Sequence, residues 1–489
     1  MCHIILCYSR SYLSHLLPEL SRAGDDLVFL HIAQNKAERA VIEGKGGRVV
    51  LVIETAIREG LVRRDCPTWH EPEDFRSVTG FDWDTIYSDR HLPEFRPELR
   101  GRVAGLLFAA FARLFADHRI VGVLSEPVAV FPTHVLQYLI KRKGGACLFW
   151  ANAYFPGHFY FSDHVTIDRP LRLIPMPDAE RDDMETAVRA YVERVAQDAA
   201  GPVYHHRFAE RKARKLDYFE QRKGQNALIY EPGLPTIAVL AARLGRACLA
   251  RLLFPRRFDY MAAASVGEHL SLLRNLLGRR RRYDAPPDGY AQGNVFYPLQ
   301  YEPEASLLYA APDVRNQLAL IESMAQALPA GHLLWVKEHP NQFGALTAPA
   351  WQRLRRRYHN LRFIYGRENG RELIRACGLA VSITSTAGMD ALIFGRRTIV
   401  LGNVFYREFP GAIALSSVAD LAAALNDPNN YVVGDFKAGI IDKMIEFGRA
   451  CYPGDPQPAT GLYAAKNVAN LYRAIHEHTV ASLAPRFDT

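Results

Sequence analysis

Lysine, histidine and hydroxyl side chains follow two apolar, strand-like runs in the C-terminal half of the sequence. Lys337 and His339 end the first run, where they offer positive charge and hydrogen-bond donors to phosphate oxygens. Pro340 follows them and stops a helix from beginning there. These residue types predict a ligand that carries a phosphate group.

Three hydroxyl residues, Thr384, Ser385 and Thr386, end the second run immediately before a predicted helix. Hydroxyls and the free backbone N–H groups of a helix N-terminus together form an anion site. Gly388 permits a phosphate to approach the backbone closely. The alternative is plain capping of the helix by Ser385 or Thr386, which requires a single hydroxyl.

Two further polar strings suit recognition of a base or a sugar at the same edge. Gln300 follows a third strand-like run and can hydrogen-bond a base or a sugar, while Glu302 can accept from a ribose hydroxyl. After a fourth run, Asn403 supplies an amide, and Tyr406 supplies a ring that can stack on or hydrogen-bond the ligand. The alternative for the Gln300 string is a polar loop shaped by its prolines.

Carboxylates for catalysis are expected in the N-terminal half. Glu126 follows the apolar run 121–124 and is placed to act as a base or nucleophile, and the alternative is that it caps the next helix. The next strand-like run, 146–150, leads into an aromatic and polar stretch that predicts an acceptor site. This stretch contains Asn152, Tyr154 and His158, with Asp163 as a second carboxylate candidate.

The elements that must position these residues alternate between short apolar strands and helices in both halves of the chain. This alternation is typical of doubly wound α/β domains with parallel sheets, whose ligands bind beyond the carboxyl ends of the strands. We therefore predict two Rossmann-like domains that face a cleft, in a GT-B-like architecture. The predicted boundaries are 1–200 for the N-terminal domain, 201–288 for a basic, largely helical insertion, 289–435 for the second Rossmann-like domain and 436–489 for C-terminal helices that cross back onto the N-terminal domain.

The formal charge of +8 is concentrated in residues 203–283, which hold 17 Lys and Arg against 6 Asp and Glu. This segment carries a net charge of +11, so the rest of the chain carries −3, which argues against a nucleic-acid-binding surface over the whole protein. Within the segment, Arg243, Arg246 and Arg251 lie among leucines, a pattern typical of a helix on an anionic membrane. The alternative is a solvated helix that packs its leucines on the protein.

Several function classes lose support from the sequence. It lacks a run of about eighteen apolar residues that would span a membrane, and its start does not read as a secretion signal. The seven cysteines have no metal-ligand spacing, which predicts reduced thiols in a cytoplasmic protein. Asp82 and Asp84 form a metal-binding DxD string by spacing, but no apolar strand precedes them, and we predict no metal site. The absence of G-x-S-x-G, P-loop and G-x-G-x-x-G strings argues against hydrolases, kinases and dehydrogenases.

Taken together, the four C-terminal strings resemble the capsule polysaccharide biosynthesis family, which includes bacterial β-Kdo transferases. The resemblance covers residues 294–412 and rests on Pro-Leu-Gln at 298–300, His-Pro at 339–340, the hydroxyl–Gly–Ala-Leu segment at 385–392 and the Gly-x-x-Phe-Tyr loop at 402–411. The His-Pro pair and the hydroxyl cluster are also similar to those of GT-B sialyltransferases. After Gln300 the string is Tyr-Glu-Pro-Glu-Ala-Ser, where the family is expected to have Asp-Ser, and this departure leaves the donor sugar open.

The resemblance implies a metal-independent glycosyltransferase that moves Kdo or a related ulosonic acid from a CMP donor to a glycan or lipid-linked acceptor, in capsule or lipopolysaccharide synthesis. It also implies that His339, Ser385 and Thr386 hold the donor phosphate in a nucleotide-sugar-binding C-terminal domain, and that configuration is retained. Apart from the donor, no cofactor and no nucleic acid are expected. The cytoplasmic protein would meet the inner face of the membrane through residues 203–283. The alternatives are a UDP- or GDP-sugar transferase or epimerase of the same fold, and a non-catalytic scaffold of capsule assembly.

Overall fold

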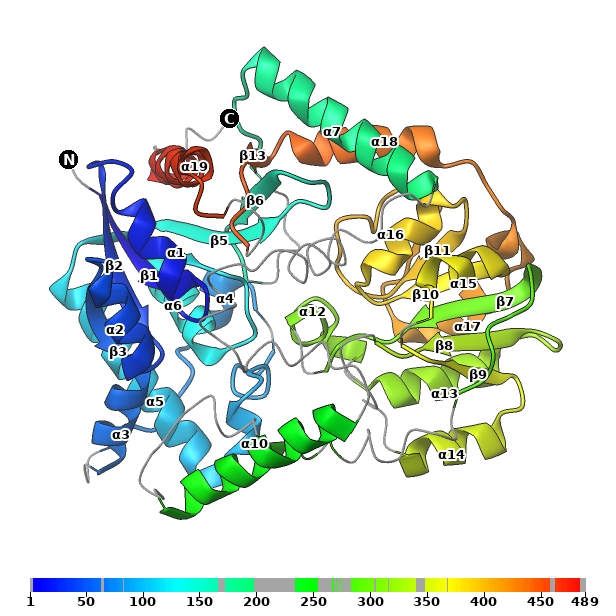
Figure 1. The fold of residues 1–489 in the computed structure, drawn as a ribbon, viewed down its shortest axis with the longest axis horizontal. Coiled ribbons are helices and arrows are strands. Elements are labelled where there is room, and N and C mark those ends of the chain that lie inside the picture. Colours follow the sequence, from blue (N-terminus) through cyan, green and yellow to red (C-terminus); the bar gives the residue numbers. More distant parts are fainter. Residues whose placement is uncertain are drawn as a thin grey trace.

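The computed structural model shows two α/β domains, each built on one sheet (Figure 1). Among the described residues, the N-terminal sheet has seven strands in the order β13-β6-β5-β4-β1-β2-β3. The C-terminal sheet has six strands there, in the order β12-β11-β10-β7-β8-β9. The structure describes residues 3–62, 66–81, 83–165, 172–197, 234–253, 266–267, 270, 273, 283–302, 305–314, 316–339, 348–366, 368–457 and 462–483.

The N-terminal sheet is mostly parallel. Strands β1 to β5 pair in parallel, whereas β6 runs antiparallel to β5, and β13 runs antiparallel to β6. The strands are β1 (His3–Tyr8), β2 (Leu27–Ala33), β3 (Arg48–Val52), β4 (Ile120–Ser125), β5 (Ala146–Asn152), β6 (His158–Ser162) and β13 (Cys451–Pro453). The helices of this half are α1 (Leu13–Leu20), α2 (Lys36–Gly44), α3 (Ile53–Val62), α4 (Phe75–Thr79), α5 (Pro97–Asp117), α6 (Phe131–Arg142) and α7 (Asp178–Ala196), with a short 3₁₀ turn η1 (Leu92–Glu94).

The C-terminal sheet is parallel throughout its described strands. These are β7 (Ala291–Pro298), β8 (Leu333–Lys337), β9 (Leu361–Ile364), β10 (Cys377–Ser382), β11 (Arg397–Val400) and β12 (Ala412–Ala414). The helices are α10 (Leu234–Leu253), α12 (Ala305–Leu308), α13 (Gln317–Ala327), α14 (Ala348–Arg357), α15 (Gly370–Ala376), α16 (Thr386–Ile393), α17 (Leu421–Asn426), α18 (Lys437–Gly448) and α19 (Ala465–Leu483), with 3₁₀ turns η3 (Pro312–Val314), η4 (Val418–Asp420) and η5 (Pro428–Tyr431).

Side-chain capping fixes where several helices begin. Asn35, Asn316 and Asn369 each accept a hydrogen bond from a backbone N–H in the first turn of α2, α13 and α15. Such caps satisfy donors that a helix N-terminus otherwise leaves unpaired. The strands between these helices are rich in buried aliphatic residues, as parallel strands covered on both faces require. These features confirm the predicted fold class of two Rossmann-like domains.

The chain crosses between the domains more than once near its C-terminus. Helix α18 packs beside α7 and both lie over α16 of the C-terminal domain, whereas α19 returns to pack on α1 and β5 of the N-terminal domain (Figure 1). Within the segment 436–489, predicted as C-terminal helices, α18 ends at Gly448 and β13 adds an unpredicted strand to the N-terminal sheet. Helix α7, predicted as part of the N-terminal domain, contributes Met184 and Val188 to a core shared with Met389 and Leu392 of α16.

Most of the basic segment 203–283 lies outside the described residues, as does Asp82 of the DxD string. The described part of the segment includes α10, whose Leu240 is buried against Ile237, Leu273 and Tyr365. Among the residues that the structure describes, no helix is both long enough and apolar enough to cross a membrane.

Candidate active site

The predicted phosphate-binding residues lie at the carboxyl edge of the C-terminal sheet. Lys337 ends β8 and pairs in register with Pro298, which ends β7 beside it. The Lys337 ammonium is buried and donates to the backbone carbonyl of Gly366 at 2.5 Å, and burial lowers its pKa to about 8. His339 is half-buried, and its ring meets the ring of Tyr301 edge to face at 5.7 Å. Pro340 lies outside the described residues.

Glu338 separates the two basic residues and faces a different partner. Its carboxylate is buried and accepts a hydrogen bond from the Tyr283 hydroxyl at 2.5 Å. Tyr283 lies just before β7, so this contact ties the start of the C-terminal domain to the end of β8. Lys337 and His339 are therefore held beside a carboxylate that already has a hydrogen-bond donor of its own.

Gln300 and Glu302 are organised by Gln317 at the start of α13, a residue that the sequence analysis did not single out. The Gln317 amide accepts from the backbone N–H of Gln300 at 2.8 Å and donates to the Glu302 carboxylate. Burial raises the pKa of Glu302, and the hydrogen bond from Gln317 opposes that shift. Gln300 is buried, and its Nε2 has no hydrogen-bond partner among the described residues. Both predicted base- or sugar-binding residues thus lie at the end of β7, with Gln300 buried and Glu302 half-buried.

The hydroxyl string begins α16. Ser385 is the N-cap and accepts from the backbone N–H of Ala387 at 3.2 Å. Thr386 is exposed, and the Thr384 hydroxyl is buried without a partner among the described residues. Capping therefore occupies one of the three hydroxyls, as the alternative interpretation requires, and leaves the other two for a ligand.

Tyr406 does not reach a ligand at this edge, which corrects the predicted stacking role. Its ring is fully buried, and its hydroxyl lies 2.8 Å from the Ser382 hydroxyl and 2.5 Å from the carbonyl oxygen of Ser385. The ring instead packs under the loop 382–385 before α16, and its hydroxyl contacts both ends of that loop. A Cβ on Gly388 would lie 2.4 Å from this hydroxyl, so the glycine makes room for Tyr406. The side chain of Asn403, by contrast, is exposed at the rim.

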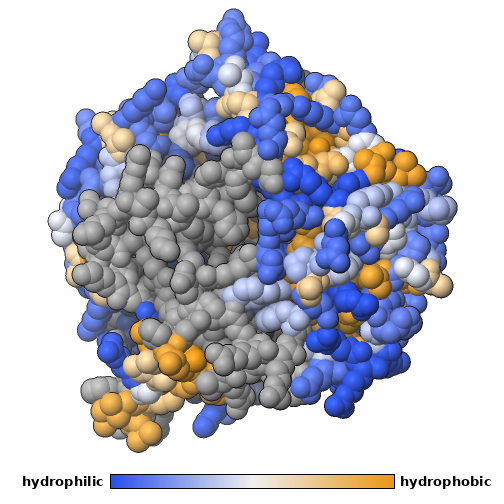
Figure 2. Space-filling model, turned by 45° about the vertical axis from the view of Figure 1, so that its right-hand side comes forward, coloured by the Kyte–Doolittle hydropathy of each residue, from blue (hydrophilic) through white to orange (hydrophobic). Residues whose placement is uncertain are grey.

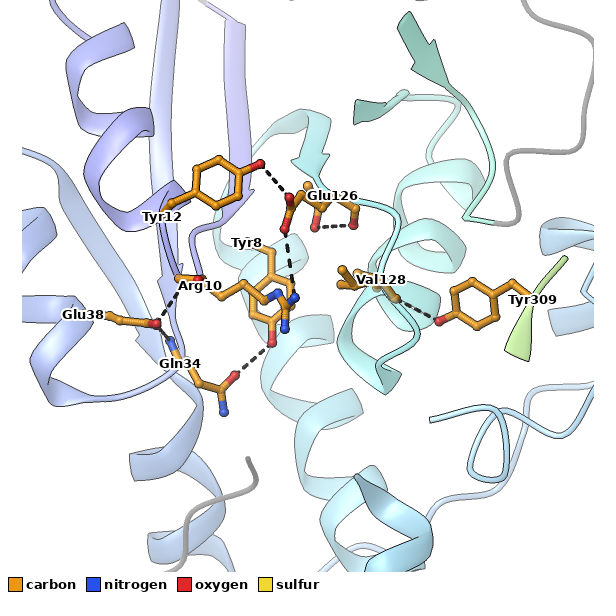
Figure 3. A network of polar contacts seen from close by, with 11 residues as sticks. Tyr8, Arg10, Tyr12, Gln34, Glu38, Glu126, Val128 and Tyr309 are labelled. Carbon is orange, nitrogen blue, oxygen red and sulfur yellow. Dashed lines mark hydrogen bonds and ion pairs between the residues drawn. The ribbon is translucent and has the colours of Figure 1, made fainter. Parts of the chain in front are cut away.

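Glu126 follows β4 and is held by two residues of the loop after β1 (Figure 3). The Tyr12 hydroxyl donates to its carboxylate at 2.6 Å, and the Arg10 guanidinium lies 4.0 Å away. Burial and the neighbouring Glu126 raise the pKa of Tyr12 well above its usual value, so this phenol remains a donor across the physiological range. Glu126 does not cap α6, because the first backbone N–H of that helix, at Phe131, donates to the Asp89 carboxylate instead. The Glu126 carboxylate is thus held in place by a hydrogen bond from Tyr12 and by the nearby Arg10 guanidinium.

One residue of the C-terminal domain fixes the loop after Glu126. The Tyr309 hydroxyl lies 2.9 Å from the carbonyl oxygen of Val128 and 2.7 Å from His134 Nε2, deep in the N-terminal domain (Figure 3). The next residue, Ala310, accepts from the backbone N–H of Asn403 at 2.7 Å. Continuous contacts therefore lead from the Glu126 loop to the carboxyl edge of the C-terminal sheet.

The predicted acceptor residues meet other parts of the chain. Tyr154 stacks on Phe405 of the C-terminal domain, with ring centroids 3.5 Å apart, and so joins the two domains. The Asn152 amide donates to Asp455 at 2.8 Å, and its oxygen is buried without a partner among the described residues. His158 contacts the carbonyl of Pro156 and the ring of Phe155, and burial lowers its pKa.

Asp163 is not brought to Glu126. Its side chain is 55% exposed and lies 3.9 Å from Lys141, in the last turn of α6. Strand β6 runs antiparallel to β5, and its last residue, Ser162, lies level with Phe149 of β5 and so with Ser125 at the end of β4. The ion-pair partner of Asp163 is Lys141 and not Glu126. The catalytic role of Asp163 stays a prediction.

The part of the DxD string that the structure describes has a local role. Asp84 accepts from the backbone N–H groups of Ile86 and Tyr87, each at 2.9 Å, and so closes a turn. Among the described residues, no three His, Cys, Asp or Glu side chains gather closely enough to hold a metal ion.

Comparison with known proteins identifies the domain that carries the phosphate-binding residues. Residues 279–425 match the family model of capsule polysaccharide biosynthesis proteins. The predicted family resemblance is confirmed. The capsule polysaccharide biosynthesis segment runs from before β7 into α17 and contains all four polar strings. Among curated proteins, no sequence matches the chain.

Solved structures that resemble the chain include two β-Kdo transferase structures of KpsC from Thermosulfurimonas dismutans. The β-Kdo 2,7 transferase is 16% identical, with 48% of this chain and 65% of that chain covered and a TM-score of 0.23. The β-Kdo 2,4 transferase is 12% identical, with 67% and 87% covered and a TM-score of 0.26. A glycosyltransferase from Rickettsia africae is 8% identical, with 99% of each chain covered and a TM-score of 0.30. With TM-scores of this size, none of the three alignments bears on the chemistry of this chain.

Several residues of the site were missed by sequence reasoning. Arg10 and Tyr12 follow β1, and the rule that ligands bind beyond the carboxyl ends of parallel strands points to them as it pointed to Glu126. That rule does not point to Asp455 or Tyr309, because neither follows a parallel strand of its domain. They reach the N-terminal domain because the chain crosses between domains, and local sequence does not encode that contact.

Proposed function

We propose that this protein is a glycosyltransferase of surface polysaccharide synthesis that transfers Kdo or another CMP-activated ulosonic acid to a glycan or lipid-linked acceptor. The match of residues 279–425 to the capsule polysaccharide biosynthesis family supports this proposal. The observation that carries it is the line of contacts from Glu126 through Tyr309 to the loop of Asn403. That line connects the loop of the held carboxylate to the carboxyl edge of the C-terminal sheet, at whose strand β8 Lys337 lies.

The residues present suit such a reaction without a metal ion. His339, the exposed Thr386 and the N-terminus of α16 would bind the donor phosphate, and the Lys337 charge would stabilise the CMP leaving group. In direct transfer, Glu126 takes the proton of the acceptor hydroxyl while the new C–O bond forms and the bond to the phosphate oxygen breaks. In a retaining reaction, Glu126 would instead attack the anomeric carbon as its bond to the phosphate oxygen breaks and CMP leaves. In a second step the acceptor oxygen would displace the Glu126 carboxylate while its hydroxyl proton passes to solvent.

The test is a thermal-shift panel with CMP, UMP, GMP, UDP and GDP on the wild type, on His339→Ala and on His359→Ala. His359 is exposed on the same domain and serves as the matched control. Stabilisation by CMP that His339→Ala loses and His359→Ala keeps is the expected result. Stabilisation by UDP or GDP would contradict a CMP donor and favour the alternative of a UDP- or GDP-sugar enzyme. No response to any nucleotide would favour the scaffold.

We also propose that the protein works at the inner face of the cytoplasmic membrane. Leu234, Leu249, Leu252 and Leu253 of α10 are exposed, and Figure 2 shows hydrophobic side chains gathered at the lower edge of the molecule, in the region where Figure 1 places α10. Arg243 and Arg246 lie between these leucines, which suits an anionic surface. The enzyme should float with anionic vesicles at low salt, and Leu252→Ser with Leu253→Ser should reduce the bound fraction. Failure of the wild type to float would exclude the membrane.

A further inference from the structure

Two buried hydrogen-bond donors beside Glu126 have no partner among the described residues. They are Nε of Arg10 and Nε2 of Gln34, and both side chains lie beyond the carboxyl ends of neighbouring strands, β1 and β2 (Figure 3). A buried donor without a partner destabilises the fold unless a bound group satisfies it. Other buried polar atoms of the described residues also have no partner, but these two follow adjacent strands of the sheet edge that carries Glu126, and one of them belongs to a charged side chain, so together they point to a bound group.

The orientation of the Gln34 amide is fixed by its surroundings. Its oxygen accepts from the Tyr8 hydroxyl at 2.9 Å, which leaves the NH₂ group as the end without a partner. The backbone N–H of Gln34 donates to Glu38 at 3.0 Å, and the side chain is almost fully buried. The donor is therefore held in place before any ligand binds.

The carboxylates around Arg10 are engaged by other groups. Glu38 accepts from the backbone N–H groups of Ser11 and Gln34, and Asp89 accepts from those of His91 and Leu92 at 2.6 Å each. Glu126 accepts from Tyr12 and remains 4.0 Å from the guanidinium, which is longer than a hydrogen bond. Arg10 thus pairs with Glu126 at 4.0 Å and has no direct hydrogen bond to a carboxylate among the described residues.

We propose that Arg10 and Gln34 bind the carboxylate of an acidic sugar whose reacting atom lies against Glu126. A guanidinium N–H and an amide N–H can each donate to one carboxylate oxygen, and the guanidinium supplies the opposite charge. A neutral sugar hydroxyl would leave that charge uncompensated. This inference rests on the proposed transfer of an acidic sugar and adds to it the two residues that bind the carboxylate.

The probes are the methyl glycoside of Kdo and its neutral methyl ester, with binding measured by calorimetry on the whole protein. The wild type should bind the acid at least about tenfold more tightly than the ester, since a charge-assisted hydrogen bond is worth about 1.5–3 kcal/mol. Arg10→Gln should abolish this preference. Gln34→Glu, which keeps the size of the side chain and places a carboxylate at the site, should reverse it. Arg39→Gln, on the exposed face of α2, should leave it unchanged.

Equal affinity of the wild type for acid and ester would overturn the inference, as would an Arg10→Gln variant that is folded by circular dichroism and keeps the preference. Displacement of the glycoside by inorganic phosphate at equal concentration would reassign the pocket to phosphate. Steady-state kinetics of Arg10→Gln show whether the bound carboxylate belongs to the donor or to the acceptor. An increased KM for the CMP-sugar means that the donor carries it, and an increased KM for the acceptor means that the acceptor carries it. CMP binding at the His339 site is measured separately, so loss of the proposed function and loss of this inference are distinguishable.

Discussion

Gly388 offers a test of whether its lack of a side chain serves a phosphate or the packing of Tyr406. The residue lies in the first turn of α16, and a Cβ built there would lie 2.4 Å from the Tyr406 hydroxyl and 2.9 Å from Cβ of Ser382. Tyr406 is fully buried and its hydroxyl contacts Ser382 and Ser385, so the ring has no room to move. Alanine at this position therefore strains the core beneath the hydroxyl string.

The magnitude follows from the size of the overlap. Real Cβ atoms essentially never approach to under 3.0 Å, so the Tyr406 hydroxyl must shift by several tenths of an ångström at least. Overpacking of this kind costs about 1–3 kcal/mol, and each kcal/mol lowers Tm by about 2–4 °C for a domain of this size. Gly388→Ala should thus lower Tm by about 2–12 °C, as measured by scanning calorimetry. Gly44→Ala is the matched control, because nothing lies within 4 Å of a Cβ there, and Tm should not fall.

A double-mutant cycle with Tyr406→Phe isolates the contact. Tyr406→Phe alone removes two hydrogen-bond contacts of a buried hydroxyl, at about 1–3 kcal/mol. In the double variant the hydroxyl is gone and the nearest ring atom is the Cζ at 2.9 Å, so part of the overlap is removed. The double variant should therefore lose less stability than the sum of the losses in the two single variants. Strict additivity would refute the packing argument. Gly388→Ala with an unchanged Tm and lost CMP binding would support the phosphate interpretation instead.

Three further predictions concern single contacts. The pKa of Lys337 is lowered by burial to about 8 from an ordinary value of 10.5, so CMP affinity should fall as pH rises through about 8. Between these values Lys337 holds more proton in the unfolded chain than in the folded one, so its own contribution to folding stability should rise with pH. The buried thiols of Cys7, Cys147, Cys377 and Cys451, whose pKa burial raises, act in the opposite direction above their ordinary value of 9.0. The stability trend of Lys337 is therefore the difference between the melting curves of the wild type and Lys337→Met from about pH 7 to about pH 10, and calorimetry over that range should show the fall in CMP affinity, which Lys337→Met should flatten. Tyr309→Phe should destabilise the protein by about 1–3 kcal/mol, because Val128 and His134 lose their partner; an unchanged Tm would contradict the proposed link between domains. Arg371→Met breaks a buried ion pair with Asp390 at 2.9 Å and should cost about 3–5 kcal/mol, most of which Arg371→Met with Asp390→Leu should recover; a double variant as unstable as the single one would contradict this.

Which residues stand at the strand ends depends on local order in the chain and could be predicted. Lys337, His339 and Ser385 stand at the ends of apolar runs, and parallel strands bring such ends to one edge, so their grouping followed from the chain alone. Glu126 was found by the same argument. The antiparallel strand β6, which precedes Asp163, was not predicted, because its alternation of aromatic residues was interpreted as a ligand rim.

What the sequence by itself determined is the alternation of strands and helices, the two domains and the polar residues at the strand ends, since these depend on periodicity and on neighbours in the chain. Only the tertiary structure decided which polar groups remain available. It buried Tyr406 beneath Ser385, used Tyr154 to join the domains and left Arg10 and Gln34 with donors that have no partner among the described residues. Those outcomes depend on contacts between residues far apart in the sequence, such as Tyr309 with Val128, and such contacts are set by the packing of whole elements.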